Sequence, residues 1–142
     1  MRDPAFSARS LPVPQPESEF YWQKLRQREI WLRHCTDCDH TYFYPRDFCP
    51  RCFSRATEWI KSRGQATLYT FTLVHKAGPA AFKNALPYVA ALVELEGSAR
   101  IPTNLVEIEP NPAKVKIGMK LEPVFIDAAD AITLLYFRPR RS

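Results

Sequence analysis

The chain has 142 residues, 46% of them hydrophobic and 25% charged, which is typical of a globular protein with one core. No run of about 18 apolar residues occurs, so no segment is expected to span a membrane. The start of the sequence lacks the apolar stretch of a signal peptide, and we therefore expect a cytoplasmic protein. The net charge is +5, but Lys and Arg are spread over both halves of the chain, which argues against a phosphate-binding stripe.

The N-terminal segment is rich in proline and has few residues that pack into a core. We expect residues 1–16 to form an extended arm that a partner could order. Ser18 suits an N-cap, and the sequence SEFYWQKLRQREIWL that begins there predicts a helix. Its apolar face would carry Tyr21, Leu25 and Leu32, and its polar side is basic, as in many solvated helices.

All four cysteines lie in eighteen residues, as two Cys-x-x-Cys pairs separated by ten residues. Each pair can direct two sulfurs toward one point, and four thiolates complete the tetrahedral shell of a structural Zn²⁺. The alternative is a redox pair, but that motif needs only one Cys-x-x-Cys, between a strand and a helix. Four sulfur ligands leave no open coordination position, so the ion is expected to be structural. The predicted ligands are Cys35, Cys38, Cys49 and Cys52.

The residues that follow the two cysteine pairs are unusual. Glycine is common there because the backbone is left-handed, yet this chain has Asp39 and Phe53. Asp tolerates that conformation, whereas Phe adopts it poorly. We therefore expect the second turn to differ slightly from the first.

After the cysteines the pattern changes from helical to extended. Because no long helical crossover separates the apolar segments, they predict a small closed or partly open β-barrel. In the first segment, alternation places Tyr69, Phe71 and Leu73 on one face, and in the third, Pro102 predicts an edge or a bulge. The five expected strands cover residues 66–75, 88–96, 100–109, 119–126 and 131–139.

The sequence offers no set of catalytic side chains, so we predict none. The cysteines are assigned to a metal, and no Gly-rich phosphate loop occurs. His34 and His40 flank the first cysteine pair, and His75 ends a strand, all positions with ordinary structural roles. Glu94 and Glu96 share one strand face, which solvation at an edge explains more simply than acid–base catalysis.

Taken in order, these segments resemble the family of acyl-CoA-associated zinc-ribbon/OB-fold proteins, a domain of unknown function found with thiolase-like proteins. The resemblance covers about residues 17–139, and the missing glycines after the cysteine pairs are its clearest departure. It implies a mainly β chain: an N-terminal helix and rubredoxin-like zinc ribbon over 17–62, then a five-stranded OB-fold barrel over 63–142. It rests on the aromatic helix with Phe20, Tyr21 and Trp22, the cysteine segment, and GQATLYTFTLVH, PYVAALVELE, IPTNLVEI, IGMKLEPVF and LLYFRP.

The resemblance also implies a partner. Family members are similar to small subunits of complexes that act on acyl-CoA thioesters, in which a thiolase-like chain carries the chemistry. We therefore expect a non-catalytic accessory subunit that helps to form the acyl-CoA site of a thiolase, or of an aldolase or hydratase of steroid or other acyl-CoA breakdown. A two-fold thiolase-like dimer with one copy of this chain on each side would be a heterotetramer.

Two sets of residues are expected to serve that function. Aromatic residues exceed what a short ribbon buries alone, so they either anchor a partner or pack the ribbon against the barrel. The expected anchors are Phe20, Tyr21, Trp22, Trp31 and Tyr44, with Tyr42, Phe43 and Phe53 nearby. The cations expected to hold the phosphates of CoA, near the irregular stretch 76–87, are Arg46, Lys76 and Lys83.

A second hypothesis is that the chain binds single-stranded nucleic acid, a common use of both folds. Tyr69, Phe71 and Tyr88 would then stack on bases. Their alternation fits a barrel core equally well. Salt separates the hypotheses, because phosphate binding weakens steeply with salt and an apolar subunit interface does not.

Overall fold

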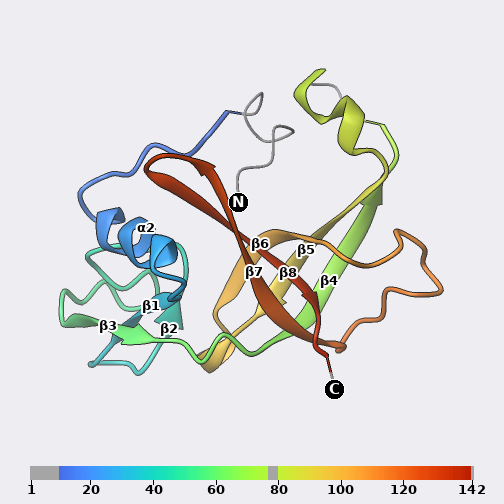
Figure 1. Cartoon of the computed structure of the whole chain (residues 1–142). Helices are drawn as coiled ribbons and strands as arrows, with labels where there is room; N and C mark the ends of the chain where they lie inside the picture. Colours follow the sequence, from blue (N-terminus) through green and yellow to red (C-terminus); the bar gives the residue numbers. More distant parts are fainter. Residues whose placement is uncertain (1–9, 77–79, 142) are drawn as a thin grey trace.

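The computed structural model describes residues 10–76 and 80–141. A three-stranded ribbon lies beside a closed five-stranded barrel, which confirms the predicted fold class (Figure 1). None of the helices in these ranges is long and apolar enough to cross a membrane. The elements follow in the order α2 (Glu19–Arg26), β1 (Trp31–Cys35), β2 (Thr41–Tyr42), β3 (Thr57–Lys61), β4 (Ala66–Val74), η1 (Ala80–Ala85), β5 (Tyr88–Glu94), η2 (Glu96–Ser98), β6 (Arg100–Leu105), β7 (Lys120–Ala129) and β8 (Ile132–Pro139).

Two segments predicted from the sequence lie partly outside the described residues. Of the predicted extended arm, residues 1–9 lie outside the described residues, and residues 10–15 form neither helix nor strand. Within the irregular stretch before β5, residues 77–79 also lie outside them. The part of that stretch next to β5 forms η1, a 3₁₀ helix.

α2 is shorter than the sequence predicted. Ser18 occupies the N-cap, but the helix ends at Arg26 and the chain turns at Arg28, whose φ is 65°. Trp31 and Leu32 therefore lie on β1, and the prediction of one helix through Leu32 was wrong. The apolar residues of β1 continue the helical spacing of α2 by chance. Periodicity alone does not distinguish such a strand from a longer helix.

The barrel has the strand order β4-β5-β6-β8-β7, and β7 pairs back with β4. β6 and β8 are parallel, and within these described strands they pair at one position, Leu105 with Phe137. Pro102 lies on β6 away from that position, where a missing N–H costs no bond to β8. Along residues 101–104 and 134–136 the two described strands have no further ladder pairing, and the Thr103 hydroxyl donates to the Leu135 carbonyl at 2.9 Å; we call this stretch the seam.

A bulge in β4 changes which side chains face the core. Leu68 is 1% exposed, and past the bulge Phe71 and Leu73 pack against the same core. Tyr69 is 43% exposed, with the guanidinium of Arg100 3.8 Å from its ring centroid. The prediction that grouped Tyr69 with Phe71 and Leu73 was wrong, because one inserted residue reverses the alternation.

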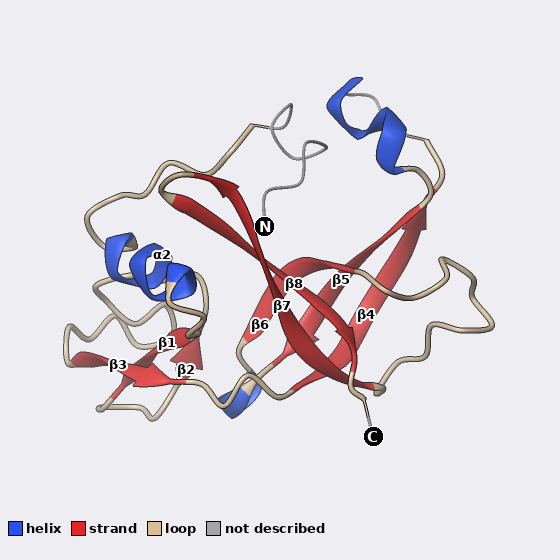
Figure 2. Cartoon of the chain, in the orientation of Figure 1, coloured by secondary structure: helices blue, strands red, loops and turns tan. Residues whose placement is uncertain are grey.

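The ribbon and the barrel share one hydrophobic core. α2 lies against the β7–β8 hairpin (Figure 2), and its Tyr21 and Leu25 belong to the same buried cluster as Phe137 of β8. On the other side of the ribbon, η2 comes so close to β2 that a Cβ on Gly97 would lie 2.6 Å from the Cβ of Thr41. The two parts are therefore fixed to each other by direct packing.

An ion pair adds a polar contact between the turn after α2 and the barrel. Nη1 and Nη2 of Arg28 each donate to one oxygen of the Asp127 carboxylate, at 2.9 Å. The Arg28 hydrogen bonds, with one from Thr133, hold the pKa of Asp127 below its ordinary value. A carboxyl with a lowered folded pKa stabilises the fold above its unfolded pKa of about 3.9, and that stabilisation is lost as pH falls through the folded pKa.

We expect Asp127→Asn to lower the free energy of unfolding at pH 7 by less than about 1 kcal/mol, because an exposed ion pair is screened by solvent. The side chains of Arg28 and Asp127 are 44% and 37% exposed. The difference from wild type should shrink below about pH 4, because the wild-type carboxyl then takes up its proton in the unfolded chain before it does so in the folded one. Urea unfolding at a series of pH values measures it, and a difference that grows toward acid would contradict the assignment.

Candidate functional site

Two turns of matching backbone geometry hold the four cysteines. The N–H of Asp39 donates to the carbonyl of Cys35 at 2.9 Å, and the N–H of Phe53 donates to that of Cys49 at 2.8 Å. The φ angles of Asp39 and Phe53 are 64° and 63°. The expectation that the second turn would differ was wrong, because Phe53 adopts the left-handed conformation despite its bulk.

The sulfurs converge on a point that fits a zinc ion. All four Sγ atoms lie within 4.8 Å of one another. The Sγ atoms of Cys35 and Cys52 are 3.6 Å apart, as are those of Cys38 and Cys49. Tetrahedral Zn²⁺ with Zn–S bonds of about 2.3 Å separates its sulfurs by about 3.8 Å, so the cysteines would need little movement to bind it.

The environment of the sulfurs favours a thiolate at one position. Burial disfavours ionisation of Cys49, but the N–H groups of Cys52 and Arg51 outweigh it and lower the pKa of the thiol to about 7. The Arg51 N–H lies 3.3 Å from the Cys49 sulfur. Burial instead raises the pKa of Cys38 to about 12. Because Zn²⁺ binds thiolates, its binding would release the protons that remain on such thiols.

The predicted aromatic anchors join α2 to the ribbon through two sets of contacts, Phe20 with Trp31 and Tyr21 and Trp22 with Tyr44. Phe20 packs edge-on against Trp31, with ring centroids 5.4 Å apart, and Trp22 Nε1 donates to the Tyr44 hydroxyl at 3.1 Å. Tyr21 is 2% exposed, so packing within the chain accounts for it. The other four are half-buried, and their contact with a partner stays a prediction.

The predicted phosphate-binding cations do not come together. Arg46 lies in the ribbon, where it pairs with Glu17 at 3.1 Å. Lys76 follows β4 and Lys83 lies in η1, and both are exposed. In Figure 1 the ribbon and η1 lie at opposite sides of the molecule, so Lys83 lies apart from Arg46.

A groove of about 510 Å³ lies between the ribbon and the barrel. It follows β5 and β6 and the seam between β6 and β8. β5 and β6 are the second and third barrel strands, the face that OB-folds use for ligands. The sequence did not predict it, because it is assembled from segments far apart in the chain. Its lining comprises residues 10–12 of the arm, Tyr21, Trp22, Phe43 and Tyr44 on the ribbon side, Phe82 of η1, and barrel residues 90–91, 101–104 and 134–136.

Comparison with known proteins gives the family. Residues 22–58 match the family described as the ChsH2 rubredoxin-like zinc ribbon domain, and residues 59–125 match the ChsH2 C-terminal OB-fold domain. A DUF35 domain-containing scaffold protein of Methanocaldococcus jannaschii is 39% identical over 107 residues, which cover 73% of each chain. The chain belongs to the DUF35 family. The family resemblance expected from the sequence is thereby confirmed.

Two other similar proteins are described as an aldolase and as a subunit of a hydratase. A solved structure described as the Ltp2-ChsH2(DUF35) aldolase contains a chain that is 32% identical, with a TM-score of 0.75, covering 90% of this chain and 98% of that one. A probable enoyl-CoA hydratase alpha subunit of Thermomonospora curvata is 32% identical over 131 residues. The DUF35 chain spans only 40% of that relative's length, although 92% of its own residues match.

Proposed function

We propose that this protein is a non-catalytic subunit that binds a thiolase-like partner and contributes part of an acyl-CoA site. A structural Zn²⁺ would stabilise its ribbon. The groove carries the proposal. It lies on the ligand face of the barrel, its lining is mainly apolar, and the aromatic side chains of the ribbon and Phe82 of η1 border it. Such a groove suits the apolar part of an acyl thioester.

The named relatives support this reading. One is the alpha subunit of a probable enoyl-CoA hydratase, and another was solved as part of an aldolase. Both names describe enzymes with more than one subunit, as the proposal requires. For this protein we propose two copies on a two-fold dimer of the partner.

The chemistry is assigned to the partner because the reactive side chains of this chain have structural roles. The cysteines converge on the metal site. His34 lies between the carboxylates of Asp39 and Glu58, at 2.7 and 3.0 Å, which raises its pKa. His40 stacks on Tyr42. These contacts orient the ribbon, and none of the four cysteines and two histidines lines the groove.

The phosphates of CoA need cations at the end of the groove. Lys83 follows Phe82, which lines the groove, and Lys76 precedes the same connection between β4 and β5. We propose that these two lysines contact the phosphates, because ammonium groups bind phosphate as point charges. Arg46 lies in the ribbon and forms an ion pair with Glu17, so we do not assign it to phosphate binding.

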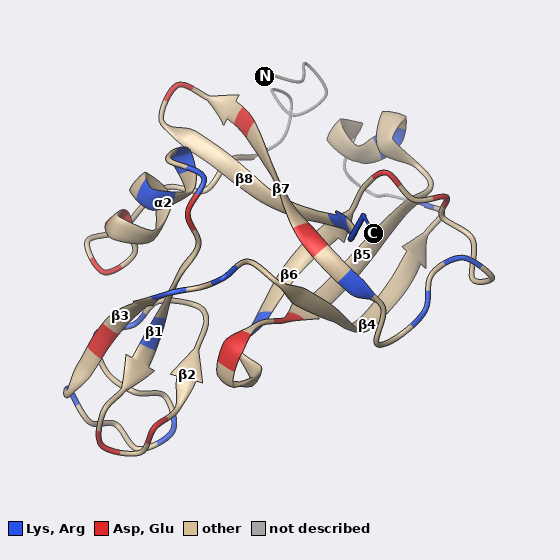
Figure 3. Ribbon diagram, turned by 60° about the horizontal axis from the view of Figure 1, so that its bottom comes forward, with Lys and Arg blue, Asp and Glu red and all other residues tan. Residues whose placement is uncertain are grey.

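The structure does not favour the nucleic-acid hypothesis. Phe71 packs against the core, and Tyr88 packs against Phe82 with ring centroids 6.0 Å apart. The guanidinium of Arg100 lies over one face of the Tyr69 ring. Figure 3 shows basic and acidic residues interspersed over ribbon and barrel, rather than a basic stripe along one face.

Capture from a native extract tests the proposal. We expect the tagged, zinc-loaded chain to retain a thiolase-like protein in a one-to-one ratio, and the complex to survive moderate salt because apolar contacts are insensitive to it. The purified complex should turn over acyl-CoA, and the chain alone should not. Mass spectrometry, zinc analysis and acyl-CoA turnover are the measurements.

Two results would contradict the proposal. Turnover by the chain alone, at a rate comparable to that of the complex, would show that it carries a catalytic site. Nucleic acid captured instead, and released by moderate salt, would support the rival hypothesis. Nuclease treatment of the extract before capture is the control for a partner held indirectly through nucleic acid.

A further inference from the structure

Phe53 is a large apolar side chain in a conformation that glycine would adopt without strain. Its φ is 63°, an outlier for a bulky residue, and it is 73% exposed. Its counterpart in the first turn, Asp39, has a φ of 64°, but the Asp39 carboxylate is engaged by His34 at 2.7 Å. A strained residue that packs little within its own chain points to a role outside it.

A second exposed ring accompanies Phe53. Phe48 is 39% exposed, and the two ring centroids are 6.3 Å apart. The rings flank the turn that carries Cys49 and Cys52, so the metal site would hold their backbone in place. Rigid aromatic groups on a fixed backbone lose little conformational entropy on binding, which is typical of interface anchors.

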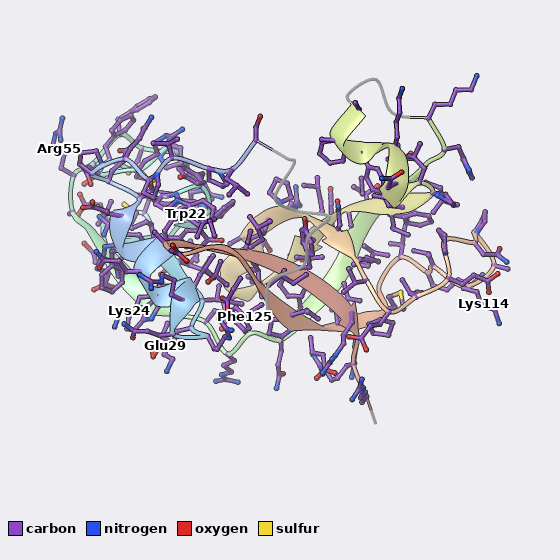
Figure 4. All side chains as sticks on the ribbon, turned by 45° about the horizontal axis from the view of Figure 1, so that its top comes forward. Trp22, Lys24, Glu29, Arg55, Lys114 and Phe125 are labelled. Carbon is purple, nitrogen blue, oxygen red and sulfur yellow. The ribbon has the colours of Figure 1, made fainter. Side chains whose placement is uncertain are left out.

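The segment that carries these rings is rich in arginine. Residues 45–55 contain three arginines and one aspartate. Arg46 is paired with Glu17, whereas within the described residues no ion pair engages Arg51 or Arg55. Arg55 projects from the end of the ribbon that lies away from the barrel (Figure 4). Phe48, Arg51, Phe53 and Arg55 thus form a surface of exposed rings and arginines, which we call the knuckle patch.

We infer that the knuckle patch docks the chain on its partner subunit, at a surface with an apolar pocket for Phe53 and carboxylates facing Arg55. The inference rests on the proposed function, since it locates the contact with the proposed partner. Arginine and aromatic side chains are enriched at the centres of protein interfaces, whereas lysine, the main phosphate point charge, is absent from the patch. Docking through the knuckle patch leaves the groove free for its ligand.

Phe53→Gly separates docking from folding. Glycine suits a φ of 63°, so the variant should keep one zinc per chain and a melting temperature at or above that of wild type. Its dissociation constant for the captured partner should rise at least tenfold because the anchor is lost. Asp39→Gly is the matched control, with the same φ on the other turn, and should bind within about twofold of wild type. Calorimetry measures the affinities.

Arg55→Glu tests the charge. It should slow association severalfold at low salt, and the effect should fade as salt is raised, because an exposed charge that faces opposite charges on the partner speeds the encounter and is screened by salt. If Phe53→Gly binds the partner as tightly as wild type, the inference is wrong while the proposed function stands. If the wild-type chain captures no partner, the proposed function fails and the inference fails with it.

Discussion

Cys49→Ser is expected to release the Zn²⁺ and unfold the ribbon while the five barrel strands stay folded. Cys49 is fully buried, and its sulfur lies 3.6 Å from that of Cys38. Metal binding contributes on the order of 10 kcal/mol to the folding of such a module, and the short ribbon strands cannot replace that with a core of their own. The barrel closes by its own strand pairing, so its amides should remain protected.

The measurements are zinc content and hydrogen exchange. Amides of residues 31–61 should lose protection in Cys49→Ser, and those of 66–74 and 88–94 should keep most of theirs. Partner capture should be lost as well. Thr36→Ala is the control, because Thr36 lies between two ligands but contributes only an exposed hydrogen bond to Ala56. One zinc per chain with a protected ribbon in Cys49→Ser would show that three ligands suffice.

Gly97→Ala is expected to loosen the ribbon from the barrel. The new Cβ would lie 2.6 Å from the Cβ and 2.7 Å from the Oγ1 of Thr41, and the Cβ cannot rotate away. Adjacent hydrogen bonds would be disturbed too, since Ser62 and the Arg63 N–H both donate to Glu96 at 2.6 Å. Overpacking costs about 1–3 kcal/mol, and the positive φ adds about 1 kcal/mol or more.

Gly118→Ala is the matched control for this variant. Gly118 also has a positive φ, 87°, but a Cβ there meets nothing within 4 Å. Its cost should therefore be the backbone term alone, about 1 kcal/mol. Urea unfolding of both variants gives the difference, which isolates the contact between η2 and β2. Equal destabilisation by the two substitutions would mean that the ribbon moves aside without cost.

The convergence of the four cysteines and the five barrel strands are the features that local sequence specifies. Two Cys-x-x-Cys pairs converge because each turn is closed by bonds between near neighbours, such as the Asp39 N–H to Cys35. The five strands appear where alternating or continuous apolar segments predicted them, because such segments bury their side chains as strands. Spacing of this kind can be interpreted from the sequence alone, because it does not depend on contacts with distant segments.

Errors arose where a distant contact competes with local pattern. Leu32 continues the helical spacing of α2, but it pairs with Ile60 in the ribbon sheet. Tyr69 alternates with Phe71, but a bulge in the pairing of β4 with β5 places it at the surface. Tyr21 has the chemistry of an interface anchor, yet the shared core buries it. In each case the partner of the residue lies too far along the chain for periodicity to reveal.

The sequence by itself determined that the four cysteines converge and where the five barrel strands lie, because both depend on residue type and short spacing. Only the tertiary structure decided that arm, ribbon, barrel and η1 line one groove, that Lys83 lies apart from Arg46, and that Phe53 is exposed. These features depend on which surfaces the shared core brings together. Packing between segments that are distant in the sequence decides which surfaces come together, and no local sequence pattern specifies this packing.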